Sequence, residues 1–363
     1  MRASCRDCLI VNRQPPITRF PFLMSRVLTF GEIMLRLATP DRQRILQATS
    51  FEATYAGGEA NVAVSLAAFG HEAAFVTVLP HGPLAEAALA SLRYYGVDTR
   101  PVLRDEGRLG VYFLETGAAQ RPSKVIYDRA GSAVSLADAA VYDWPALLRD
   151  RQAFHTTGIT PALSPTCAQA AADALRTAKK LGLTTSFDLN YRSKLWSREQ
   201  ARRTVEPLLE HVDLLVGNEE DAKDVLSITA ANTDVGGGRI EHAAYESVAR
   251  QIRDRYGVAR VAITLRESES ATVNHWSACL LDGEGFHLSR RYSMHVVDRV
   301  GAGDAFCGGL LAALLDGTPG REALEFAVAA SCLKHSIPGD FNKVTRDEVL
   351  ALCRGEASGR VVR

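Results

Sequence analysis

The sequence predicts an α/β protein of three layers, α/β/α, in which a mainly parallel sheet lies between two layers of helices. Short apolar runs alternate along most of the chain with helical stretches of about ten residues or more. Such alternation makes consecutive strands parallel and covers both faces of their sheet. The 363 residues, of which 47% are hydrophobic and 23% charged, are enough to bury a full core without disulfides or a structural metal.

Strands are expected where short apolar runs end at a glycine or a polar residue. In chain order these runs are 27–30, 74–79, 153–157, 184–188, 214–217 and 261–265, followed by a hairpin at 278–282 and 286–289. Helices are expected where apolar residues recur at helical spacing. They are 61–69, 83–95, 165–181, 198–210, 219–226, 247–256, 304–315 and 321–335. Ligands of such sheets bind beyond the carboxyl ends of the strands, so the loops after the strands are where chemistry is expected.

Residues 98–130 depart from this alternation. Gly110–Glu115 and Lys124–Tyr127 are strand-like runs around a polar turn, which predicts an inserted β-hairpin. Together with mixed strand and turn signals at 36–56, the hairpin predicts a small β-sheet lid built from about 34–56 and 98–130. An open sheet edge invites pairing, so we expect a homo-oligomer, with a dimer formed through the lid.

Charge, apolar runs and cysteines argue against several classes of protein. Lys and Arg number 42, as do Asp and Glu, so bulk attraction to nucleic acid or to an anionic membrane is not expected. No apolar run approaches the ~18 residues that span a bilayer. Seven scattered cysteines indicate free thiols in a reducing compartment, and we expect a cytoplasmic protein. Residues 1–23 are expected to be a disordered extension before a single domain at 24–363, and the glycine-rich segment 234–239 a surface loop.

The segment Asp298-Arg-Val-Gly-Ala-Gly-Asp304 carries the clearest chemical signal. A strand gives way to a helix through Gly301, Ala302 and Gly303, so main-chain N–H groups and the helix dipole face outward, as in a phosphate site. A carboxylate beside such a site makes sense where Asp304 takes a proton from a hydroxyl that attacks a phosphoryl group. The same pattern also suits an ordinary capped helix, or a dinucleotide-binding loop that here lacks its third glycine.

A second segment, Ala56-Gly-Gly-Glu-Ala-Asn61, places paired glycines before a helix, where a ligand can approach the backbone closely. Asn61 could bind a hydroxyl or cap the helix. With the inserted hairpin, the two segments resemble the ribokinase-like (PfkB-type) sugar kinases over roughly Arg26 to the C-terminus. The resemblance implies an α/β/α domain with a β lid, and ATP-dependent phosphorylation of a sugar hydroxyl. It also implies that Asp304 is the general base and that Gly301, Ala302 and Gly303 form the anion hole.

Within that family the chain resembles the 2-keto-3-deoxygluconate kinases, in the segments GVYFLE, YDRAGSA and DLNYR and in Gly339-Asp340. The resemblance implies a sugar-acid substrate. Its binding residues would be Gly58, Asn61, Tyr112, Tyr127, Arg129, Arg192, Asp304 and Asp340. Guanidinium groups bind carboxylates in bidentate fashion, which is the role implied for Arg129 and Arg192. Alternatively, Tyr112 packs in the core and Arg192 binds an ATP phosphate.

The resemblance also implies sites for ATP and Mg²⁺. The nucleotide-binding residues would be Asn218, Arg266, Arg299, Gly301, Gly303 and Val328. Asp221 would hold Mg²⁺ through water, although an acidic residue there also suits the first turn of a helix. A small residue such as Val328 would admit a flat base or simply pack its helix. Whether a monovalent cation takes part stays open.

Three positions depart from the family pattern. Glu59 stands where a small residue is usual, Arg299 where threonine is usual, and Arg266 where a turn usually has glycine, in an unusually long loop at 264–276. Arg299 would either neutralise charge on the transferred phosphoryl group or pair with Asp298. The alternatives to a sugar-acid kinase are a kinase for a neutral ketose or a nucleoside, and a sugar- or nucleotide-binding regulator without turnover.

Overall fold

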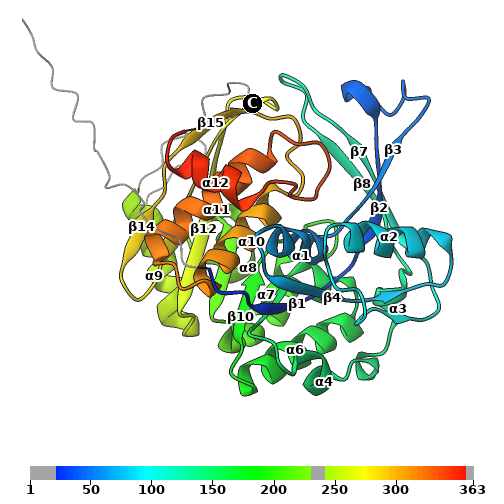
Figure 1. Ribbon diagram of the computed structural model, residues 1–363, viewed down its shortest axis with the longest axis horizontal. Helices are drawn as coiled ribbons and strands as arrows, with labels where there is room; N and C mark the ends of the chain where they lie inside the picture. The colour runs from blue at the N-terminus through cyan, green and yellow to red at the C-terminus, as the bar shows by residue number, and fades with distance from the viewer. Residues whose placement is uncertain (1–21, 230–241, 357–363) are drawn as a thin grey trace, which may run out of the picture.

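The computed structural model describes residues 22–229 and 242–356 (Figure 1). The surface loop expected at 234–239 lies outside these residues, as does the expected N-terminal extension up to residue 21. Phe22 and Leu23, the last residues of that extension, contact the domain. The Leu23 N–H donates to Asp316, and the guanidinium of Arg346 lies 5.2 Å from the centre of the Phe22 ring.

The described residues form a nine-stranded sheet with the spatial order β14-β13-β12-β11-β10-β9-β1-β4, in which β15 also pairs with β13. Its strands are β1 (Arg26–Phe30), β4 (Glu72–Val76), β9 (Ala153–Thr157), β10 (Thr184–Asp188), β11 (Leu214–Asn218), β12 (Arg260–Ser268), β13 (Val273–Leu281), β14 (Phe286–Leu288) and β15 (Tyr292–His295). Pairing is parallel from β4 to β12 and antiparallel beyond it. The expected mainly parallel sheet is therefore confirmed.

Helices cover both faces of this sheet, and a separate hydrophobic core fills each face. On one face lie α1 (Gly58–Ala68), α2 (Pro83–Tyr94), α10 (Ala302–Leu315), α11 (Gly320–Lys334) and α12 (Arg346–Cys353). On the other lie α4 (Trp144–Leu148), α6 (Pro165–Lys180), α7 (Arg198–Val205), α8 (Glu219–Leu226) and α9 (His242–Tyr256), as α4 and α6 show in Figure 1. Two short helices, α3 (Ala133–Leu136) and α5 (Ile159–Leu163), and three 3₁₀ turns at 40–42, 139–141 and 206–211 complete the set among the described residues. The three-layer prediction is confirmed.

A second sheet of four strands has the order β3-β2-β7-β8. Its strands are β2 (Met34–Ala38), β3 (Glu52–Ala56), β7 (Gly110–Glu115) and β8 (Lys124–Asp128), and Figure 1 shows them standing apart from the large sheet. The expected hairpin is its β7–β8 pair. Residues 98–104, expected to belong to this lid, pair with the large domain instead, because β6 (Leu103–Arg104) joins β5 (Val78–Leu79). The lid boundary expected at 98 is therefore too early.

Two further expectations need correction. The helix expected over 198–210 ends at Val205 and continues as a 3₁₀ turn, since Pro207 has no N–H for an α-helical hydrogen bond. The long loop expected at 264–276 is mostly strand, because β12 runs to Ser268 and β13 begins at Val273.

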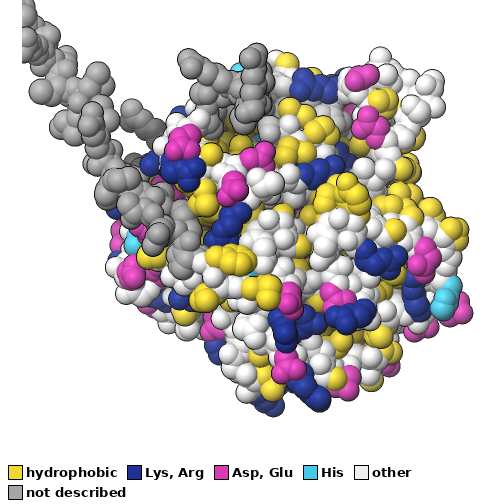
Figure 2. All heavy atoms as spheres, viewed as in Figure 1, with side chains coloured by type: hydrophobic (Ala, Val, Ile, Leu, Met, Phe, Trp, Pro, Cys, Tyr) yellow, Lys and Arg dark blue, Asp and Glu magenta, His cyan; other side chains and the backbone are white. Residues whose placement is uncertain are grey.

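Basic and acidic side chains are interspersed over the described part of the face in Figure 2. Within 22–229 and 242–356, every helix is too short or too polar to cross a bilayer.

Candidate active site

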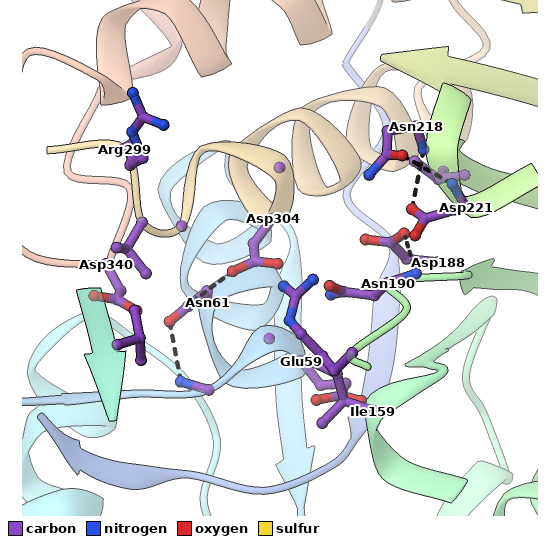
Figure 3. Close-up of a pocket in the computed structure, with 18 of the residues that line it drawn as sticks. Glu59, Asn61, Ile159, Asp188, Asn190, Asn218, Asp221, Arg299, Asp304 and Asp340 are labelled. Carbon is purple, nitrogen blue, oxygen red and sulfur yellow. Dashed lines mark hydrogen bonds between the residues drawn. The ribbon is translucent and has the colours of Figure 1, made fainter. Parts of the chain in front are cut away.

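A cavity of about 410 Å³ lies between the small sheet and the carboxyl ends of the large sheet's parallel strands. Its lining comes from the small sheet, from the loops after β9, β10 and β11, and from the first turns of α1 and α10 (Figure 3). This is the place where a sheet of this kind binds its ligands.

The cavity gathers most of the residues singled out in the sequence. Those that line it are Gly58, Asn61, Tyr112, Tyr127, Arg129, Arg192, Asn218, Asp221, Arg266, Arg299, Gly301, Gly303, Asp304 and Asp340. Ala302 is buried as the first residue of α10. Val328 is fully buried in the core on α11 and does not line the cavity, so the structure gives it the packing role rather than a nucleotide contact.

The first turn of α10 forms one end of the cavity, which we call the helix end (Asn61 and Gly301–Asp304). Gly301 has φ +82°, and a Cβ there would lie 2.0 Å from the carbonyl oxygen of Asp340, so only glycine fits. A Cβ on Gly303 would meet nothing within 4 Å. No side chain caps the helix, and no acceptor for the N–H of Gly303 or Asp304 is found in the described part of the chain. An uncapped helix start of this kind suits an anion.

Asp304 lies in this first turn and is held by Asn61. The Asn61 side-chain amide donates to Asp304 Oδ2 over 2.6 Å, and its own oxygen accepts from the Gly57 N–H over 3.3 Å (Figure 3). Burial raises the pKa of Asp304 to about 6, against the opposing effect of the Asn61 hydrogen bond. Asn61 therefore positions the carboxylate, a role that the sequence pattern did not indicate.

Asp188 and Asp221 bring two more carboxylates to the cavity (Figure 3). Burial raises the pKa of Asp221 to about 6, and it raises the pKa of Asp188 well above its usual value, with added repulsion from Asp221 and Asp304. Asp188 Oδ2 has no hydrogen-bond donor among the described residues. Carboxylate oxygens such as Asp188 Oδ2 are the ligands that a hard divalent cation prefers.

Asn218 and Asp221 also form the cap of α8. The Asn218 side-chain oxygen accepts from the Asp221 N–H over 2.9 Å, and Asp221 Oδ2 accepts from the Asn218 N–H over 3.1 Å. Asp221 Oδ1 accepts from the Tyr191 N–H over 3.1 Å. The alternative considered for Asp221, an acidic residue in the first turn of a helix, is therefore found in the structure. These hydrogen bonds fix the Asp221 carboxylate at the edge of the cavity.

The opposite end of the cavity, the small-sheet end (Glu32, Arg36, Tyr112, Arg129 and Asp340), is a network of paired charges. Arg36 is 4% exposed and donates to both Asp298 and Asp340. The Tyr112 hydroxyl donates to Asp340 Oδ2 over 2.7 Å. Arg129 forms a buried ion pair with Glu32.

The two arginines expected to bind a carboxylate differ in their surroundings. Arg129 is 9% exposed, pairs with Glu32 and lies 5.4 Å from the centre of the Tyr127 ring. Arg192 is exposed, and its guanidinium donates to the Tyr191 carbonyl over 3.2 Å. Both line the main cavity and a neighbouring one of about 250 Å³.

Sequence reasoning missed Glu32, Arg36 and Asp188 as parts of the site. Arg36 gave no clear signal, because alternation would turn an arginine between Leu35 and Leu37 toward solvent, whereas the structure buries it on the face of Met34 and Ala38. Glu32 gave none beyond its place directly after the first strand.

Glu59, the first departure from the family pattern, is buried beside the cavity. Its Oε1 accepts from the Thr157 and Thr160 hydroxyls over 2.8 and 2.6 Å. Gly31 makes room for it, since a Cβ at residue 31 would lie 2.1 Å from Glu59 Oε2. The larger side chain is thus accommodated by its neighbours.

The other two departures lie on the side of the cavity near β12. The Arg266 guanidinium is 5.4 Å from the centre of the Trp276 ring, to which it is paired across β12 and β13. Arg299 donates to the Ala271 carbonyl over 3.2 Å. It forms no ion pair with Asp298 in the described structure, whose carboxylate Arg36 binds instead, so the pairing considered for Arg299 is not found.

The comparisons with known proteins agree with this site. A model of the pfkB family carbohydrate kinases matches residues 24–344. The chain is 37% identical to the 2-dehydro-3-deoxygalactonokinase of Haloferax volcanii over 93% of its own length and 99% of the relative's. The crystal structure of the Thermotoga maritima 2-dehydro-3-deoxygluconokinase superposes with a TM-score of 0.88 at 47% identity, covering 92% of this chain and 99% of that one.

The chain belongs to the pfkB family of carbohydrate kinases. It is a phosphotransferase with the ribokinase-like fold, and its relatives include the 2-dehydro-3-deoxy sugar-acid kinases. The fold and family expected from the sequence are confirmed.

Proposed function

We propose that the protein transfers the γ-phosphoryl group of ATP to a hydroxyl of 2-keto-3-deoxygluconate or a stereoisomer of it. The observation that carries the proposal is the position of Asp304. Its carboxylate is held at the uncapped start of α10, in the same cavity as Arg129 and Arg192. A base, an anion site and cations for a carboxylate are the parts that phosphoryl transfer to a sugar acid requires.

Asp304 takes the proton of the acceptor hydroxyl as that oxygen attacks the γ-phosphorus. With a pKa of about 6 it is ionised at neutral pH, and the Asn61 hydrogen bond engages one oxygen and leaves Oδ1 for the hydroxyl. The N–H groups of Gly303 and Asp304 face the charge that develops on the phosphoryl oxygens.

Asp188 and Asp221 are the residues that would hold Mg²⁺, with Asp221 acting through water. The Asp188 Oδ2 without a donor among the described residues and the raised pKa values of both carboxyls fit such an ion, while both Asp221 oxygens are held by main-chain N–H groups. When bound, Mg²⁺ would neutralise charge on the phosphates of ATP. The capping box of Asn218 and Asp221 keeps the second carboxylate in place.

The small-sheet end would bind the sugar acid. Arg129 and Arg192 are placed to pair with its carboxylate. Tyr112, Tyr127 and Asp340 would contact the sugar, with Gly58 allowing close approach at the foot of α1. The names of the relatives, which act on 2-dehydro-3-deoxy sugar acids, support this substrate class.

The nucleotide would lie toward β12, bordered by Asn218, Arg266 and Arg299. In this arrangement Arg299 faces the phosphates beside the start of α10. Ion pairs hold Arg36 and Arg129 at the small-sheet end, so their charges would lie near the sugar and not near ATP.

The test is ADP release with ATP and Mg²⁺ on five acceptors: 2-keto-3-deoxygluconate, 2-keto-3-deoxygalactonate, fructose, ribose and adenosine. We expect turnover on the sugar acids, and a loss of kcat/KM of about tenfold or more in Arg192→Met with the sugar acids alone. Turnover on a neutral acceptor, unaffected by Arg192→Met, would replace the sugar-acid assignment with a ketose or nucleoside kinase. ATP binding without turnover on any acceptor would favour a regulator.

We also propose that two copies associate through the outer face of the small sheet. That face carries Leu35, Leu37, Val111, Phe113 and Ile126, and Ile126 is 40% exposed on the edge strand β8. Sedimentation should show a dimer whose dissociation constant rises about tenfold or more in Ile126→Asp. Leu181→Asp, at an exposed apolar position on the large domain, is the control. A monomeric wild-type protein would rule the interface out.

A further inference from the structure

Lys334, the last residue of α11, is a fully buried cation that the proposed chemistry does not use. Its side chain is 0% exposed. The ammonium donates to the carbonyl oxygens of Asp298 and Ile337 over 3.2 and 3.3 Å, and it forms no ion pair among the described residues. Burial lowers its pKa, while Asp298 and Asp340 act in the opposite direction. A buried ammonium is costly, so its place in the fold calls for an explanation.

The two carbonyls belong to the two segments that form the back of the helix end. The Asp298 carboxylate accepts from the N–H groups of Val300 and Gly339 over 3.0 Å each. The Asp298 N–H donates to the His335 carbonyl over 3.2 Å. Lys334 adds a charged contact to the same junction, because it binds one carbonyl from each segment.

Lys334 is also the only donor found for those carbonyls within 22–229 and 242–356. An apolar side chain here would leave the buried Asp298 oxygen and the partly buried Ile337 oxygen without this donor. Main-chain carbonyl oxygens that converge on one point are the ligands with which proteins replace the hydration shell of an alkali cation. The Lys334 side chain supplies a donor, and with it a positive charge, to both carbonyls.

We propose that Lys334 is a built-in cation that takes the place of a free monovalent ion and positions the 298–303 segment behind the phosphate site. Lys334 is a positioning residue, since it acts through the backbone of Asp298 and does not line the cavity. It follows that turnover of the wild-type protein is independent of K⁺, and that removing the ammonium makes turnover depend on a small cation. The inference rests on the proposed phosphate-binding role of the start of α10.

The test compares wild type, Lys334→Ala and Lys334→Met in chlorides of K⁺, NH₄⁺, Na⁺ and tetramethylammonium at a constant ionic strength of about 0.1 M. The control is Lys343→Ala, which removes an exposed lysine from the neighbouring loop. Wild type and control should vary less than about twofold among the salts. Lys334→Ala in tetramethylammonium should lose about tenfold or more in kcat/KM for ATP, and K⁺ or NH₄⁺ should restore most of it. Lys334→Met, whose side chain fills the space, should be rescued less.

Two results would overturn the proposal: K⁺ activation of the wild type by more than about fivefold, or a folded Lys334→Ala variant with the same activity in every salt. If neither Lys334 variant folds, the salt series of the wild-type protein still tests whether its turnover is independent of K⁺. ATP affinity measured by calorimetry in the same salts requires no acceptor. A wrong sugar assignment would therefore leave this test intact, whereas absent ATP binding would count against the proposed function instead.

Discussion

The two ends of the cavity achieve their polarity in opposite ways. At the small-sheet end, charged side chains are paired with other charged side chains before any ligand is present, as in Arg36 with Asp340 and Arg129 with Glu32. At the helix end, the donors are main-chain N–H groups beside small residues, and the one charge, on Asp304, is held by the neutral amide of Asn61. The charges of the small-sheet end are neutralised by ion pairs within the protein, whereas the N–H groups of the helix end are available to a ligand.

The difference predicts the largest effect for the charge at the helix end. Asp304→Asn should lower kcat by about 10²–10⁴-fold, because it removes the base while keeping the shape of the side chain. The KM for ATP should change little, since the N–H groups of the first turn remain. Steady-state kinetics measure both, and Asp173→Asn, at a partly exposed position on α6, is the control. Near-normal turnover in Asp304→Asn would remove the base assignment.

At the small-sheet end, a single change should affect stability and binding together. Arg129→Met leaves Glu32 buried without its partner, which should cost about 3–5 kcal/mol of unfolding free energy by denaturant titration. The double variant Arg129→Met/Glu32→Gln should recover most of that stability.

Substrate binding separates the two roles of this pair. The double variant should keep a raised KM for the sugar acid, because Arg129 is still missing. Arg192→Met should raise the same KM with an unchanged melting temperature, since Arg192 is exposed and forms no ion pair with another described residue. Recovery of a normal KM in the double variant would show that Arg129 serves structure alone.

ATP binding at the helix end should respond to added bulk, because the donors there are main-chain N–H groups beside small residues. Gly303→Ala adds a methyl group that meets no protein atom within 4 Å and favours the helix by about 0.5–1 kcal/mol. We therefore expect unchanged or raised stability together with a KM for ATP higher by about tenfold. Gly301→Ala is the contrasting variant, since its Cβ would collide with the Asp340 carbonyl and destabilise the fold. A normal KM in Gly303→Ala would place the phosphate elsewhere.

The sequence predicted the helix end better than the small-sheet end for a physical reason. Gly301, Gly303 and Asp304 act through one strand–turn–helix segment, so their spacing carries the information. The partners at the other end come from distant parts of the chain: Arg36 and Asp298 are 262 residues apart, and Glu32 and Arg129 are 97 apart. Local pattern cannot pair such residues.

Strands, too, were predicted correctly only where the signal is local in the sequence. Strands such as β9 and β10 match their expected bounds, because a buried apolar run between turns is a local signal. The pairing of β6 with β5, which takes residues 98–104 away from the small sheet, depends on tertiary contact and was not predicted. Val328 illustrates the same point, since small apolar residues suit both a base pocket and a helix interface.

The last prediction concerns how pH acts on the two ends. Burial raises the pKa of Asp304 from 3.8 to about 6, so the folded protein binds this proton more tightly than the unfolded chain does. The stability that this group contributes is therefore present below about pH 4 and is lost as pH rises through 6. Asp304→Asn should be more stable than wild type by on the order of 2 kcal/mol at about pH 7.5.

The gain in stability should disappear as pH falls toward 4, where wild type carries the proton itself. Denaturant titrations at several pH values measure it. In wild type, kcat/KM should fall below about pH 6 for the same reason, because the protonated base cannot accept a proton. Since the small-sheet end is already compensated, Asp340→Asn should instead lose stability at neutral pH by weakening its ion pair with Arg36. Stabilisation by both substitutions would show that the two ends do not differ in the way proposed.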